Sequence, residues 1–244
     1  SLVGSEMCIR DRNISPENMD DPDRDRFVMS KGHSVEAYYA VLAAKGFFPM
    51  EEVIEKFSKF GSPYIGHPNN KLPGIEMNSG SLGHGLPVCV GMALAGKMDK
   101  KDYRVYTVMG DGELAEGSVW EGFMAGHQYK LDNLCAVIDR NRLQISGNTE
   151  DVMGHDDLHE RIRSFGWHVI DVKDGNDIDQ LNAAFEEAKT VKGKPTAVIA
   201  NTVKGCGSSV MENKANWHHK VPTQEEYDQI IADFAARKEA ALHE

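Results

Sequence analysis

The segment from Val105 to Ile145 restricts the possible folds of this chain more than any other. It begins with a short apolar run, Val105–Met109, passes through the glycine-rich turn GDGE, and then has helical periodicity over Glu113–Tyr129. A second apolar run, Leu134–Asp139, follows the helical part. This order of strand, tight turn, helix and strand is typical of a βαβ unit, whose two strands lie parallel in one sheet.

Polar residues follow both strands of this unit. Asp111 lies in the turn, and Asn141, thirty positions later, comes just after the second strand. Because the carboxyl ends of parallel strands meet at one edge of a sheet, we expect the two side chains to converge. A helix that starts near Glu113 would direct its free N–H groups to the same place. Oxygen ligands beside an anion-binding helix end predict a hard divalent cation that holds a phosphate or diphosphate.

Each of these residues also has a simpler interpretation when it is taken alone. Asp111 could be a helix cap, and Asn141 could be a turn residue. Neither interpretation explains both residues together at this spacing, each just after an apolar strand.

The rest of the chain alternates between apolar runs typical of strands and segments with helical periodicity. This alternation predicts an α/β fold, a doubly wound and mainly parallel sheet flanked by helices, with residues 13–244 as one domain. The further predicted strands are Phe27–Met29, Trp167–Val172 and Pro195–Val203. The further predicted helices are Ser34–Lys45, Met50–Phe60, Asp156–Phe165, Asn176–Lys189 and Thr223–Leu242, with one more inside Ile75–Lys97. Gly147–His155 is expected to be a turn-rich loop.

Residues 1–12, SLVGSEMCIRDR, match nothing that follows them. They lack the apolar core of a signal peptide. The string resembles translated sequencing-adapter read-through, so we interpret it as a non-native artefact and start the fold at Asn13.

Charge and hydropathy argue against several classes of partner. The net charge of −11 argues against nucleic acid, because binding to phosphates requires a basic surface. No run of about 18 apolar residues is present, so no membrane-spanning segment is expected. The four cysteines lie far apart without a CxxC pair, which argues against a structural zinc site and fits the reducing cytoplasm. Cys89 and Cys135 lie in apolar runs and are interpreted as buried thiols.

The central motif resembles that of a known enzyme family. GDGE, followed at this spacing by an Asn after an apolar strand, resembles the thiamine-diphosphate motif. The sequence AEGSVWEGFMAGHQYKLDNLCAVIDRNRLQISG is similar to transketolase, and the resemblance extends over most of the chain from about Asn13. It implies the thiamine-diphosphate-binding fold, with thiamine diphosphate and Mg²⁺ or another divalent cation as cofactors. The implied reaction, part of the pentose phosphate pathway, transfers a two-carbon ketol group from a ketose phosphate to an aldose phosphate.

The resemblance also implies roles for individual residues. The implied metal ligands are Asp111, Asn141 and the main-chain carbonyl of Leu143. The implied catalytic residues are His67, in the GHP loop, and His218, in NWHHK. The residues implied to bind the cofactor are His33 (in SKGH), Gly80, Ser81, Leu82, Gly112, Glu113, Asn141, Ile145 and His218.

Some of these assignments leave alternatives open. Either His218 or its neighbour His219, at a position where the family often has Gly, could face the site. Leu82 and Ile145 could be apolar walls of the site or ordinary core residues. In the family, carboxylates at the positions of Glu116 and Glu121 lie at an interface between subunits, but in this chain they could equally form a solvated first turn of the helix.

One part of the family's active site has no counterpart in this sequence, namely the Glu of a second domain that activates the cofactor. The chain is therefore expected to be one component of a split enzyme or a fragment of a longer chain, and its polar final helix favours the split enzyme. The implied partner is a transketolase C-terminal subunit that supplies this Glu, in a heterotetramer built on a dimer, with sugar phosphates as substrates. In the family, a helical segment with a substrate-facing His precedes the part that begins at Asn13. The alternatives are a related ketol transferase acting on another sugar and an inactive cofactor-binding paralogue.

Overall fold

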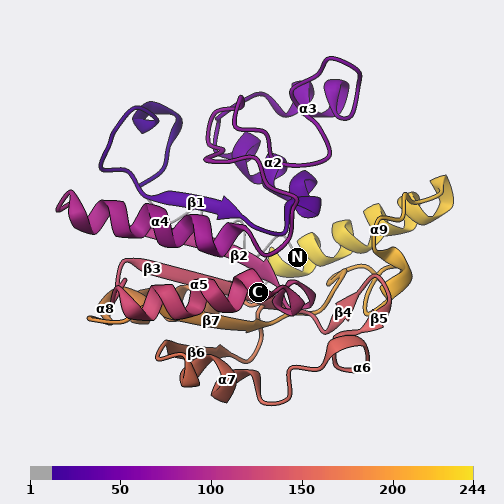
Figure 1. Cartoon of the computed structure of the whole chain (residues 1–244). Helices are drawn as coiled ribbons and strands as arrows, with labels where there is room; N and C mark the ends of the chain where they lie inside the picture. Colours follow the sequence, from indigo (N-terminus) through magenta and orange to yellow (C-terminus); the bar gives the residue numbers. More distant parts are fainter. Residues whose placement is uncertain (1–12, 244) are drawn as a thin grey trace.

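A five-stranded parallel sheet forms the centre of the protein (Figure 1). The structure is a computed structural model that describes residues 13–243. The strands lie in the order β1-β2-β3-β7-β6, and every neighbouring pair is parallel. Their bounds are Arg26–Met29 (β1), Val105–Gly110 (β2), Leu134–Arg140 (β3), His168–Val172 (β6) and Thr196–Asn201 (β7). The predicted fold class is confirmed, whereas the proposed artefact at residues 1–12 lies outside the described residues.

Helices cover both faces of the sheet and create two separate hydrophobic cores. Alternate residues of β2 enter different cores: Tyr106 and Val108 join the side chains of α2 and α8, while Val105 and Met109 join those of α4, α5 and α7. Because both faces are buried, β2, β3 and β7 have continuous apolar sequences. The α-helices are Val35–Ala44 (α2), Met50–Lys56 (α3), Gly85–Met98 (α4), Gly117–Gln128 (α5), Thr149–Met153 (α6), Leu158–Ser164 (α7), Ile178–Thr190 (α8) and Gln224–Ala241 (α9).

The turn after β2 differs from the sequence prediction. The helix predicted from Glu113 begins instead at Gly117, after the 3-10 turn Gly112–Ala115 and one extended residue, Glu116. The loop at Gly83 approaches this break closely, since a Cβ placed on Gly83 would lie 2.6 Å from Glu116 Cβ. The predicted anion-binding helix end near Glu113 is therefore a 3-10 turn, and α5 starts farther along the chain.

The segment predicted as the loop Gly147–His155 contains regular structure. Leu143–Gln144 (β4) and Gly147–Asn148 (β5) form a short antiparallel hairpin, which leads into α6. The side chain of Asn148 caps α6 by accepting a hydrogen bond from the Glu150 N–H. Two-residue strands and a five-residue helix are too short to produce a detectable hydrophobic period, so they leave no signal in the sequence.

Other boundaries agree more closely with the sequence. Gly46 has a φ of +86° and ends α2 in the left-handed conformation that a C-terminal glycine supplies. The predicted helix Met50–Phe60 ends earlier, at Lys56, because Phe57 turns to an extended ψ of 129°. Cys89 and Cys135 are buried, as interpreted from the sequence. Over residues 13–243, the structure has no helix with the length and apolar character needed to cross a membrane.

Candidate active site

A cavity of about 720 Å³ opens at the carboxyl edge of the sheet, where β1, β2, β3 and β7 end. Loops that follow these four strands supply most of its lining, as expected for a doubly wound parallel sheet. The predicted site residues that line it are His33, His67, Gly80, Leu82, Asp111, Gly112, Glu113, Asn141, Leu143, Ile145 and His218. The structure therefore brings together segments that are far apart in the sequence. Ser81 is exposed and is not part of the lining.

Asp111 is buried at the end of β2, with only 2% of its surface exposed. Its Oδ1 accepts a hydrogen bond from the Gly112 N–H at 3.0 Å, and its Oδ2 accepts one from the Arg142 N–H at 2.7 Å. Burial raises the pKa of the Asp111 carboxyl, and the nearby Asp139 raises it further. A buried carboxylate in this environment is a favourable ligand for a cation, which would compensate its charge.

Asn141 and Leu143 lie beside Asp111 along the same cavity wall. Asn141 Oδ1 accepts a hydrogen bond from the Leu143 N–H at 3.0 Å, which fixes the amide against the turn. Within residues 13–243, no three His, Cys, Asp or Glu side chains gather as a metal cluster. A cation at this wall would therefore depend on mixed oxygen ligands, a carboxylate, an amide and a carbonyl, which suit Mg²⁺.

Two lysines that the sequence interpretation did not single out, Lys31 and Lys204, also line the cavity. Lys31 is buried and forms an ion pair with Asp139, which also accepts a hydrogen bond from Thr202. Burial acts to raise the pKa of the Asp139 carboxyl, but the Lys31 ammonium outweighs this and holds it well below its usual range. Burial and the charge of Lys31 lower the pKa of Lys204. Lys31 lies in the SKGH segment. Its position just after a predicted strand was the one feature of the sequence that could have marked it as a site residue.

Three imidazole rings cluster in the lining of the same cavity. The His33 and His218 rings stack with centroids 5.1 Å apart, and the His219 ring lies 5.4 Å from His33 and 4.8 Å from His218. Burial, with Lys31 next, lowers the pKa of His33 to about 3, and burial, with Lys204 next, lowers that of His218 to about 4. Neutral imidazoles beside ammonium groups favour an anion in this part of the cavity.

The sequence left open whether His218 or His219 faces the site. In the structure both residues line the cavity, at different depths. His218 is half-buried and its Nδ1 lies 3.4 Å from Lys204 Nζ, whereas His219 is exposed at the rim. The φ of His219 is +65°, a left-handed conformation that costs little only for glycine.

Glycines allow three loops to meet beneath His67. A Cβ on Gly80, whose φ is +138°, would lie 2.5 Å from His67 Cδ2, and a Cβ on Gly32 would lie 2.7 Å from the Gly80 N. The loops that carry His33, Gly80 and His67 are therefore in direct contact, which only residues without a Cβ permit. Leu82 and Ile145 both line the cavity, and Ile145 is 72% exposed, so neither is an ordinary core residue.

Glu113 lines the cavity and also connects the loops around it. Its buried carboxylate accepts hydrogen bonds from the Ser30 hydroxyl, from the Gly83 N–H at 2.9 Å and from the Gly110 N–H at 3.2 Å. Burial raises the pKa of this carboxyl, and the Ser30 hydroxyl is the strongest influence lowering it. Glu113 therefore fixes the ends of β1 and β2 and the loop before α4.

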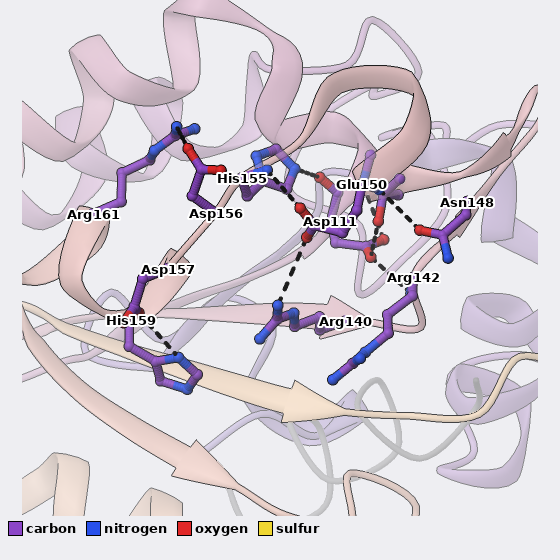
Figure 2. Close-up of polar contacts among 12 residues, drawn as sticks. Asp111, Arg140, Arg142, Asn148, Glu150, His155, Asp156, Asp157, His159 and Arg161 are labelled. Atoms are coloured by element: carbon purple, nitrogen blue, oxygen red, sulfur yellow. Dashed lines mark hydrogen bonds and ion pairs between the residues drawn. The ribbon is translucent and has the colours of Figure 1, made fainter.

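The segment after β3 supplies further contacts that the sequence did not reveal. Figure 2 shows His155 and Glu150 beside Asp111 and Arg140. His155 is buried, and its Nε2 lies 2.9 Å from the Asp111 carbonyl oxygen. Glu116 and Glu121, at the start of α5, are exposed.

Comparisons with known proteins agree with this geometry. A family model described as the transketolase thiamine diphosphate binding domain matches residues 3–239. The chain belongs to the transketolase N-terminal domain family. The recognition made from the GDGE motif and its surroundings is therefore confirmed.

Members of this family resemble the chain over most of its length. It is 51% identical to a subunit of the apulose-4-phosphate transketolase of Phocaeicola vulgatus, over 93% of this chain and 80% of that protein. It is 41% identical to the 6-deoxy-6-sulfo-D-fructose transketolase subunit SqwG of a Clostridium species, over 91% of this chain and 80% of that one. It is 43% identical to human transketolase, over 93% of this chain but 35% of that protein.

A solved structure supports the fold in the same way. Transketolase from Campylobacter jejuni superposes with a TM-score of 0.86 at 28% identity, over 92% of this chain and 36% of that one. The sheet and its flanking helices are therefore those of transketolase N-terminal domains.

Proposed function

We propose that this chain is the thiamine-diphosphate-binding subunit of a transketolase that moves a two-carbon ketol group from a ketose phosphate to an aldose phosphate. The observation that carries the proposal is the composition of the cavity. Asp111 and Asn141 bring oxygen ligands to the cavity, and Lys204, His33 and His218 bring basic side chains to it. Such a site suits a diphosphate whose charge is shared between a divalent cation and basic side chains.

The residues present fit the cofactor and its cation. Asp111, Asn141 and the Leu143 carbonyl would hold Mg²⁺, while His33, His218 and Lys204 would hold the diphosphate. Leu82 and Ile145 offer apolar surface for the rings, with Gly80 allowing close approach, and the resemblance adds Ser81 to this loop. When bound, thiamine diphosphate supplies the carbanion chemistry that the protein side chains lack.

The side chains of this chain would bind, orient and exchange protons. A diphosphate beside His33 and His218 would raise their lowered pKa values, because the anion favours the protonated ring. His218 could then pass a proton to or from the sugar, and His67, at the exposed side of the same cavity, would orient its hydroxyl groups.

We further propose that a second polypeptide completes the site. Two relatives are named as subunits of apulose-4-phosphate transketolases, and this chain spans only 35% of human transketolase. The partner would be a transketolase C-terminal subunit that supplies the activating Glu, in a heterotetramer built on a dimer in the cytoplasm.

The relatives do not agree on the sugar substrate. Relatives with similar identity to this chain are named after different ketoses. The 51% identity to a subunit of an apulose-4-phosphate transketolase favours apulose 4-phosphate as a second candidate substrate, beside the ketose phosphates of the pentose phosphate pathway. Activity of the reconstituted pair on each sugar separates these candidates.

Isothermal titration of thiamine diphosphate with Mg²⁺ into the reconstituted pair tests the proposed site. Asp111→Ala should abolish the Mg²⁺-dependent part of binding, because it removes the only carboxylate among the proposed ligands. Asp102→Ala is the matched control, since Asp102 is an exposed aspartate before β2, at the opposite edge of the sheet. Equal Mg²⁺-dependent binding by the wild type and Asp111→Ala would refute the assigned site.

A further inference from the structure

The segment from Arg142 to His155 holds Asp111 by both its side chain and its main chain. The Arg142 N–H and the Thr149 hydroxyl donate to Asp111 Oδ2, at 2.7 Å and 3.3 Å. His155 Nε2 lies 2.9 Å from the Asp111 carbonyl oxygen. Residues just before the hairpin β4–β5, at the start of helix α6 and just after it therefore form one support around this aspartate.

His155 contributes a single polar ring contact to this support. The residue is 2% exposed, and its Nε2 carries the hydrogen because it faces a carbonyl acceptor. Within residues 13–243, its Nδ1 has no hydrogen-bond partner. Burying a polar ring costs free energy unless it is hydrogen-bonded, so the bond to Asp111 is what compensates the burial of His155.

The position of His155 is itself fixed from the end of β3 (Figure 2). Its N–H donates to Glu150 Oε2 at 2.9 Å, and Glu150 Oε1 lies 3.7 Å from Arg140 Nη2. Arg140 directly precedes Asn141. A circuit of contacts thus connects the ends of β2 and β3, the two places that carry the proposed metal ligands.

We propose that His155 is a positioning residue, which fixes the main chain at Asp111 so that its carboxylate stays aligned with Asn141 and the Leu143 carbonyl. The identity of the bound ion rests on the proposed function, but the positioning of Asp111 does not. The Asp111 carbonyl also accepts from the Leu114 N–H at 3.1 Å. Loss of the His155 donor therefore leaves this carbonyl hydrogen-bonded, and variants at His155 should still fold.

Two amide substitutions separate positioning from simple packing. In His155→Gln the side-chain NH₂ reaches the place of Nε2 and can donate to Asp111. In His155→Asn the NH₂ lies at the place of Nδ1 and is too short to reach. In the reconstituted pair with thiamine diphosphate, titrated with Mn²⁺ and followed by electron paramagnetic resonance, we expect His155→Asn to bind about 10–100-fold more weakly than the wild type. We expect His155→Gln to bind within about threefold of it.

Amide hydrogen exchange on the chain by itself gives a readout that needs no metal. The peptide over residues 110–116 should exchange faster in His155→Asn than in the wild type, and should be protected again in His155→Gln. Equal exchange in all three proteins, or equal loss in both variants, would overturn the proposal. If the wild-type pair bound no Mn²⁺ while the exchange pattern held, the proposed cofactor site would fail and the positioning role of His155 would stand.

Discussion

Replacing Gly32 by alanine should displace the loop that contains Gly80 and disturb the site without altering any charged or catalytic group. An added Cβ on Gly32 would lie 2.7 Å from the Gly80 N, 2.8 Å from the Ser79 C and 2.9 Å from the Gly80 Cα. All three atoms belong to the backbone, so a side-chain rotation gives no relief. Reaching an ordinary contact of 3.4 Å requires one of the two loops to move by about 0.7 Å.

The cost of this movement follows from overpacking a closed interior. Forcing one extra methyl group into such a contact typically costs about 1–3 kcal/mol. In a chain of this size that loss lowers the melting temperature by about 2–12 °C. Because Gly80 supports His67, and His33 follows Gly32 directly, both imidazoles should shift. Misplacement of catalytic groups by less than 1 Å can reduce turnover by up to about 100-fold.

Thermal unfolding of the chain and turnover of the reconstituted pair measure the two effects. Gly91→Ala is the matched control, because an added Cβ there meets nothing within 4 Å. Gly91 lies inside α4, so alanine should stabilise the protein by about 0.5–1 kcal/mol. If Gly32→Ala melted within 1 °C of the wild type and kept full turnover, the close contact between the loops would be wrong. A lower melting temperature with full turnover would mean that the contact supports the fold but not the site.

Three further predictions concern charges and backbone strain around the cavity. Lys31→Met removes the ammonium beside the buried Asp139 carboxylate, so urea denaturation should show a loss of about 3–5 kcal/mol; a loss below about 1 kcal/mol would contradict the burial of this pair. In the folded chain the pKa of His33 is about 3 and that of His218 is about 4, both below the unfolded value near 6.5. Between pH 6.5 and these lower values the unfolded chain therefore binds more protons than the folded chain, and the free energy of unfolding falls as the pH falls. The melting temperature should therefore fall between pH 6.5 and pH 4, less steeply with added pyrophosphate, and a His33→Asn/His218→Asn variant with the same slope would refute this. His219→Gly removes the strain of a left-handed φ of +65°, which costs about 1 kcal/mol, so the variant should melt no lower than the wild type. The KM for the sugar phosphate should rise. An unchanged KM would show that His219 does not bind the substrate.

The sequence was sufficient to predict the parts of the site that follow from local pattern and sheet geometry. Asp111 and Asn141 each follow a continuous apolar strand, and parallel strands must end at a common edge. Their convergence on one cavity therefore needed no knowledge of the contacts between side chains. The glycine-rich loops were similarly informative, because a run such as GSLG marks a place where another backbone approaches closely.

Other parts of the site depend on contacts that no local pattern reveals. Lys31 and Asp139 are 108 positions apart, and each alone resembles an ordinary charged residue at the end of a strand. The motif around Glu113 predicts cofactor binding, but the role of this residue in fixing Ser30 depends on a partner 83 positions away. His155 follows a five-residue helix that has no detectable period, so neither its burial nor its bond to Asp111 could be predicted.

The place of β7 in the sheet has a consequence for how the protein is made. β7 lies between β3 and β6, yet it is the last of the five strands to be synthesised. At about 5–20 residues per second, the ribosome needs roughly 3–12 s to pass from the end of β3 to the end of β7. During that time the edge of β3, and β6 once it has been synthesised, lack the strand that will later join them. Unpaired apolar edges of this kind attract other strands, so we expect the unfinished sheet to be the part of the nascent chain that is most prone to aggregation.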